Sequence, residues 1–131
     1  MQTRQNEAGF TLIGMLIAVG IVAILAMIAV PKFTSAIASA NTAKIQSDLS
    51  TLDTAIALYE IDNGAQPSTI SDLAEYLQDT DIKPPSGKCY VGGKEDAVPA
   101  SEYSIKDGRA NCGEGKTVGA FYKDKKTAVK S

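Results

Sequence analysis

The chain runs from Phe10 to Val30 without a charged side chain, after a short polar segment at its start. Only Thr11, Gly14 and Gly20 interrupt the apolar character of this run. As an α-helix, a run of this length is about 30 Å long, which matches the hydrocarbon core of a bilayer. The rest of the chain is too short to build a soluble core around such a helix. The run is therefore predicted to be a transmembrane helix.

After Pro31 the pattern changes from uniformly apolar to amphipathic. Asn63 and Gly64 favour the end of the helix, because glycine readily adopts the left-handed conformation of a C-terminal cap. Pro31 has no amide hydrogen to donate to the carbonyl of Met27, so a bend near it is expected, with a proline tolerated without consequence as the alternative. Apolar residues recur at helical spacing at Ile45, Leu49, Leu52, Ile56 and Tyr59.

The remaining residues carry shorter patterns. Thr69 and Asp72 have the spacing of a capping box ahead of a short helix. Asp107-Gly108 is typical of a tight hairpin turn. We expect an α+β fold, in which the amphipathic half of the long helix packs on a small antiparallel sheet. The predicted strands are Lys88 to Val91, Tyr103 to Lys106, Arg109 to Cys112 and Val118 to Tyr122.

Composition argues against nucleic-acid binding and against the common forms of catalysis. The chain has 13 basic and 15 acidic residues, so it has no basic surplus for a polyanion and we expect no obligatory nucleic-acid partner. Histidine is absent, which removes the commonest general base and the commonest metal ligand. The acidic pairs Asp79 with Asp81 and Glu95 with Asp96 lack the spacing of a calcium loop. No enzyme activity, cofactor or metal site is expected.

Two cysteines, Cys89 and Cys112, are too far apart in the sequence for a CxxC redox or zinc motif. In an exported protein an even pair predicts a disulfide, and the membrane segment favours such an oxidising compartment. The bond would close a loop of about 24 residues and stabilise the domain by about 3 kcal/mol. Two unpaired buried thiols in a cytosolic domain are the alternative.

A cleaved secretory signal peptide is a second interpretation of the apolar run, because Ala38-Ser39-Ala40 has the pattern of a signal-peptidase site. The run is longer than the apolar region of a usual signal peptide. Pro31-Lys32 separates it from that site, and Glu7 accompanies Arg4 in the N-terminal segment. These features favour a segment that stays in the membrane.

The order Gly9-Phe10-Thr11-Leu12-Ile13 ahead of the apolar run resembles the prepilin cleavage motif of type IV pilins and type II secretion pseudopilins. The resemblance extends to about Gly64 and includes Pro31, which matches the helix-kinking proline of these families. It implies that prepilin peptidase cuts after Gly9 and that Phe10 becomes an N-methylated terminus. Glycine before the cut suits close approach of a protease to the backbone.

The resemblance also implies a type IV pilin fold and a division of the chain. Residues 1–9 would be a leader, 10–30 the transmembrane and filament-core helix, 31–64 the amphipathic half of the helix, and 65–131 a small globular domain. The disulfide would close its C-terminal region.

The implied function is that of a structural pilin subunit of a type IV pilus, used for adhesion, motility or DNA uptake. The implied partners are the prepilin peptidase and methyltransferase, other pilin subunits and the pilus assembly machinery. The precursor would lie in the inner membrane and the filament outside the cell. A type II secretion or competence pseudopilin is the first alternative, and a membrane-anchored binding domain that keeps residues 1–9 is another.

One position departs from the family pattern. Most members have a glutamate where this chain has Gly14, and that glutamate is thought to pair with the terminal ammonium of a neighbouring subunit. A buried ammonium and carboxylate offset each other's desolvation, whereas either one alone is costly. This departure allows two interpretations: a minor subunit at the filament tip, or a major subunit in which another group meets the amine.

Overall fold

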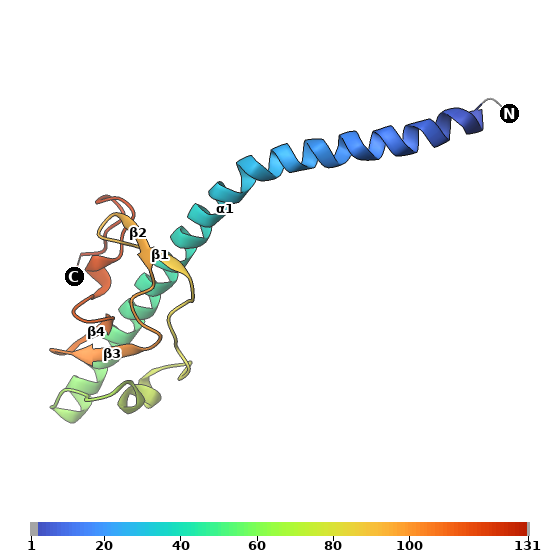
Figure 1. The fold of residues 1–131 in the computed structure, drawn as a ribbon. Helices are drawn as coiled ribbons and strands as arrows, with labels where there is room; N and C mark the ends of the chain where they lie inside the picture. Colours follow the sequence, from blue (N-terminus) through green and yellow to red (C-terminus); the bar gives the residue numbers. More distant parts are fainter. Residues whose placement is uncertain (1–2, 131) are drawn as a thin grey trace. The chain divides into compact units, whose positions relative to one another are not determined.

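The computed structural model describes residues 3–130, and the side chains of residues 11–130 (Figure 1). The chain separates after Ala36 into two compact units. The first unit is purely helical. The second contains the rest of the same helix and all of the described strands.

Helix α1 spans Thr3–Asn63 and continues through Pro31. The hydroxyl of Thr34 donates to the carbonyl of Val30 at 3.1 Å. The predicted stop is confirmed, because Gly64 has a φ of 67° and its amide donates to the carbonyl of Glu60 at 2.9 Å. The long helix of the sequence interpretation is therefore present, and it begins seven residues before Phe10.

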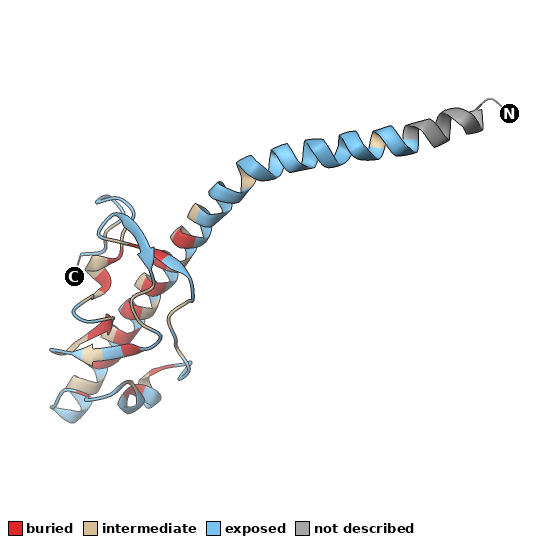
Figure 2. Ribbon diagram, in the orientation of Figure 1, coloured by how far each residue is buried: buried red, intermediate tan, exposed pale blue. Residues whose placement is uncertain are grey.

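In the second unit one face of α1 is buried (Figure 2). The predicted apolar stripe forms this face: Ile45, Leu49 and Leu52 are fully buried and Ile56 is 2% exposed. Tyr59 packs against the same core. The core is completed from the C-terminal part of the chain by Leu73, Leu77, Cys89, Tyr103, Ala110, Cys112, Val118 and Phe121.

The short helix after α1 is the 3-10 helix η1, Ile70–Tyr76. Asp72 accepts the amides of Ser68 and Thr69 at 3.0 and 2.9 Å, which confirms the predicted capping interaction. These two backbone hydrogen bonds hold the pKa of Asp72 below its usual value.

Four strands form two separate antiparallel hairpins, where the sequence predicted one sheet. Strand β1 (Lys88–Val91) pairs with β2 (Lys94–Ala97), and β3 (Tyr103–Lys106) pairs with β4 (Arg109–Cys112). The bounds of β1, β3 and β4 are those predicted. Strand β2 was missed because its four residues are exposed and mostly charged, so that they show no alternation of apolar and polar positions.

The predicted strand from Val118 to Tyr122 is wrong. Val118–Ala120 forms the 3-10 helix η2. Val118 and Phe121 both enter the core, and a spacing of three suits a helical turn rather than a strand. The backbone of this segment instead binds the tip of the first hairpin, where Gly92 donates to Ala120 at 2.8 Å and Gly93 to Tyr122 at 3.0 Å.

Polar side chains of α1 fix both hairpins to the helix. Asp53 accepts the Arg109 guanidinium at 3.1 Å and the Ala110 amide at 2.8 Å. The hydroxyl of Thr42 accepts the Tyr90 amide at 2.7 Å. These bonds satisfy backbone amides that the small hairpins cannot pair themselves.

Asp53→Ala should therefore lower the free energy of unfolding of the second unit by about 2 kcal/mol, since it leaves a charged partner and a backbone amide unpaired. Asp53→Asn keeps an acceptor for the Ala110 amide and should cost less. Thermal unfolding of the full chain in detergent, followed by circular dichroism, measures both. As a control, Glu95→Ala removes only the exposed 3.2 Å ion pair with Lys88 and should change little. Equal stability of Asp53→Ala and the parent would contradict this account.

Candidate membrane and assembly site

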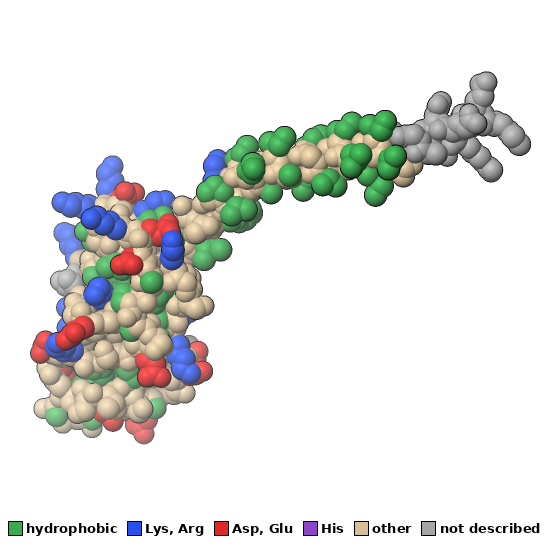
Figure 3. Space-filling view, viewed as in Figure 1, with side chains coloured by type: hydrophobic (Ala, Val, Ile, Leu, Met, Phe, Trp, Pro, Cys, Tyr) green, Lys and Arg blue, Asp and Glu red, His purple; other side chains and the backbone are tan. Residues whose placement is uncertain are grey.

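The helical first unit leaves its apolar side chains in the open. Within the described residues α1 is the single helix long and apolar enough to cross a membrane, and its most apolar window has a mean hydropathy of 2.9 and is 0% buried. Figure 3 shows apolar side chains along this segment. Ile17, Leu25 and Met27 are 57%, 60% and 79% exposed. Each such side chain would gain about 1.5–3 kcal/mol from complete burial, so the segment favours lipid or other apolar helices over water.

The positions predicted for processing lie at the start of this helix. The backbone of Gly9 and Phe10 is helical, but their side chains lie outside the described residues. The structure therefore tests neither the cut nor the methylation. Gly14 lies within α1, and the sequence has no acidic residue between Glu7 and Asp48. No carboxylate of this segment can replace the one that Gly14 lacks.

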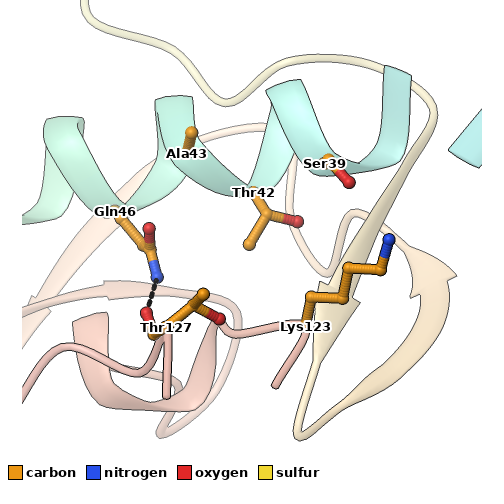
Figure 4. Close-up of a pocket in the computed structure, with 6 residues that line it drawn as sticks. All are labelled: Ser39, Thr42, Ala43, Gln46, Lys123 and Thr127. Atoms are coloured by element: carbon orange, nitrogen blue, oxygen red, sulfur yellow. Dashed lines mark hydrogen bonds between the residues drawn. The ribbon is translucent and has the colours of Figure 1, made fainter. Parts of the chain in front are cut away.

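A hollow of about 260 Å³ lies between α1 and the C-terminal segment (Figure 4). Ser39, Thr42 and Ala43 line it from the helix, and Lys123 lines it from the C-terminal segment. The side-chain amide of Gln46 donates to the carbonyl of Phe121 at 2.5 Å and to that of Thr127 at 3.2 Å, which holds the segment on the helix. The lining contains one ionisable group, Lys123, and no pair of groups suited to acid and base catalysis.

Both cysteines are buried, and they come from different hairpins: Cys89 from β1 and Cys112 from β4. They are free thiols in the structure, so the predicted disulfide is not shown. Burial raises the pKa of Cys89 to about 11, with a smaller contribution from nearby Cys112, and burial also raises the pKa of Cys112. Thiols of this kind are poor nucleophiles near neutral pH.

Among the described residues no three histidine, cysteine or acidic side chains gather as a metal site would require. The acidic pairs considered from the sequence have other contacts. Asp81 lies 2.8 Å from the ammonium of Lys83, and Glu95 lies 3.2 Å from that of Lys88.

The sequence did not predict a hydrogen bond between the polar side of α1 and strand β3, which is made by Asp48. Asp48 forms an ion pair with Lys44, one helical turn earlier, and it also accepts the Tyr103 hydroxyl at 2.7 Å; its side chain is 16% exposed. Burial and this hydrogen bond raise the pKa of Tyr103. Asp48 directly precedes Leu49 of the apolar stripe, and this position at the edge of the buried face was the available signal.

Comparison with known proteins gives one family match and several relatives. Residues 4–30 match the prokaryotic N-terminal methylation motif. The chain is 31% identical over 87 residues to a type II secretion system core protein G of Klebsiella michiganensis, a match that covers 66% of this chain and 61% of that relative. Identity to the core protein G of Pseudomonas aeruginosa is 38% over 87 residues, which cover 66% of this chain and 57% of that relative.

A third relative is the competence protein ComGC of Halalkalibacterium halodurans, which is 32% identical over 85 residues. That match covers 63% of this chain and 81% of the relative. No solved structure was found to match the chain.

Proposed function

We propose that this chain, which belongs to the pilin-like family related to the type II secretion pseudopilins, is a structural subunit of a pilus-like filament. The observation that carries the proposal is the exposed apolar helix directly behind a methylation motif. Such a helix can lie in the membrane before assembly and pack against other copies afterwards. Both environments remove the same apolar surface from water.

The relatives favour a pseudopilus over an adhesive type IV pilus. The sequence alone placed the type IV pilus first, with a secretion or competence pseudopilin as the alternative. Relatives named as secretion core protein G and as a competence protein support that alternative. The precursor would lie in the inner membrane, and the filament would extend into the periplasm.

Processing after Gly9 is part of the proposal. A leader with Arg4 and Glu7 would place charges among packed apolar helices, where unpaired charges are costly. Prepilin peptidase and its methyltransferase activity are the proposed partners at this step. Residues 10–30 would then form the filament core, and residues 31–64 and 65–131 the exposed head. Pro31, which cannot donate to the carbonyl of Met27, is the proposed point of bending or local unwinding during assembly.

Protein recovered from filaments should begin at Phe10 and carry one N-terminal methyl group. Gly9→Val should block the cut and leave the precursor in the membrane, because the side chain obstructs the approach of the protease to the backbone. Intact-mass and N-terminal peptide analysis report both features. Gly20→Val is the control for the cut alone: it lies away from Gly9, a Cβ there meets no atom within 4 Å of the same chain, and membrane protein of this variant should still lose the leader. An intact leader, or a terminus at Asn41, in filament protein would refute the processing proposal.

We also propose the Cys89–Cys112 disulfide for the exported protein. Both thiols are fully buried, and a bond would join the β1–β2 hairpin to the β3–β4 hairpin, which share no strand pairing. Protein that is denatured without reductant and treated with iodoacetamide should take up no label. After reduction it should take up two labels. Two labels without reduction would show that the cysteines are free thiols.

Gly14 is the residue that we propose as the test of whether the subunit belongs to the shaft or to the tip of the filament. If the shaft needs a carboxylate to meet the terminal ammonium of a neighbour, Gly14→Glu should raise the ratio of this subunit in isolated filaments to that in membranes. In a tip subunit the added carboxylate would be buried unpaired, and the ratio should fall. Gly14→Gln is the control without charge. An unchanged ratio for Gly14→Glu would show that this position does not control assembly.

A further inference from the structure

The second unit has an uneven charge distribution along the chain. Between residues 45 and 82 there are eight acidic residues and no lysine or arginine. Residues 116–131 contain five lysines and one acidic residue. The whole chain has a net charge of only −2, so its overall composition does not reveal that acidic and basic residues are concentrated in different segments.

The acidic residues include a group at the far end of α1, which we name the acidic end: Glu60, Asp62, Asp72 and Glu75. Helix η1 is held beside the end of α1, because the Tyr76 ring meets the Tyr59 ring at 6.0 Å and its hydroxyl donates to Asp62 at 2.9 Å. Asp62, Asp72 and Glu75 are exposed, and Glu60 is half-buried. No ion pair within residues 11–130 uses any of the four.

The lysines of the C-terminal segment form a second group, which we name the basic end: Lys123, Lys125 and Lys126. All three are exposed. Gln46 fixes this segment beside α1 through Phe121 and Thr127, and the Lys123 ammonium lies 5.3 Å from the centre of the Tyr90 ring. No ion pair among the described residues uses these lysines.

The two ends lie at different heights along one rigid helix. The basic end is tied to α1 at Gln46, and the acidic end begins at Glu60. At 1.5 Å per residue these positions are about 20 Å apart along the axis. That exceeds the Debye length of about 8 Å at physiological salt, so each end presents its own charge to a partner. In Figure 3 basic side chains gather toward one end of the visible face of the second unit, whereas acidic side chains occur along its whole length, including the other end.

We infer that the basic end of one copy binds the acidic end of the next copy in the filament. This inference rests on the proposed function, because it requires copies that pack with their apolar helices parallel. All heads then point the same way. Neighbours at equal height would bring like charges together, whereas an axial offset brings the basic end of one head to the acidic end of another. The charge pattern would thereby select the offset between subunits, as a head-to-tail contact that repeats along an open helix.

An anionic lipid surface is the other partner that lysines could bind. It would use the basic end alone and leave the acidic end without a role. A second copy uses both ends, and both belong to the same unit of the chain. The second copy is therefore the partner that the charge distribution favours.

The test changes the charge of each end separately and then of both together. Lys125→Glu with Lys126→Glu changes the charge of the three-lysine basic end from +3 to −1, and Glu60→Lys with Glu75→Lys changes that of the four-residue acidic end from −4 to 0. The first pair gives both ends the same sign and the second removes the attraction, so each should lower the fraction of the full chain found in isolated filaments by at least about tenfold. The chain with all four substitutions has the net charge of the parent, and its ends no longer repel each other. It should assemble at least about threefold better than the basic-end variant.

The control is Asp81→Lys with Glu114→Lys, which changes the net charge as much as the acidic-end substitutions and uses two exposed residues that belong to neither end. It should assemble like the parent, and circular dichroism in detergent checks that all variants keep the fold. Folded single-end variants that assemble normally, or a folded fourfold variant that assembles no better than the basic-end variant, would overturn the inference. Reduced assembly of the basic-end variant, with normal assembly of the acidic-end variant, would show that the basic end acts without the acidic end, as it would on an anionic lipid surface, and would also overturn it. A parent chain that forms no filament would instead refute the proposed function.

Discussion

The need to remove an exposed apolar helix from water governs this molecule. Within the described residues the first unit has no core of its own, and none of the side chains between residues 11 and 30 is buried. Lipid satisfies this surface for a single copy, and packed helices of other copies satisfy it in a filament. In the proposed function, membrane insertion and polymerisation are therefore two solutions to one physical problem, and removal of the charged residues before Phe10 would allow the passage from one to the other.

The head depends on that helix in turn. Its two hairpins are too small to be stable alone, since isolated two-stranded hairpins are marginal in water. The buried face of α1 supplies the surface on which they pack, and Asp53 and Thr42 bind strand amides from the edges of that face. A head built in this way keeps the charged ends at set heights along the helix. Helix α1 therefore stabilises the fold of the head and, in the inferred assembly, also sets the spacing of the charged ends.

Much of this fold follows from local patterns. The helix stripe, the cap at Thr69 and Asp72, and the Asp107-Gly108 hairpin each depend on neighbouring residues, and each was predictable. The separation into two hairpins and the helical turn at Val118 depend on contacts with distant segments, which periodicity does not report. At the candidate site, the ordered motif predicts the cut after Gly9 and the family pattern draws attention to Gly14, and both stay predictions. The contacts of Asp48 and the grouping of charges at two ends became visible only in three dimensions.

The central claim is that the apolar segment is covered by lipid in the membrane and by other copies in the filament. Ile24→Cys places a thiol in the middle of that segment, and Ser101→Cys places one at an exposed position of the head that belongs to neither charged end. Labelling with a membrane-impermeant maleimide should modify the head cysteine in intact filaments and leave the segment cysteine unmodified. Both should react once detergent and denaturant separate and unfold the subunits. Rapid labelling of Ile24→Cys in intact filaments would contradict the account.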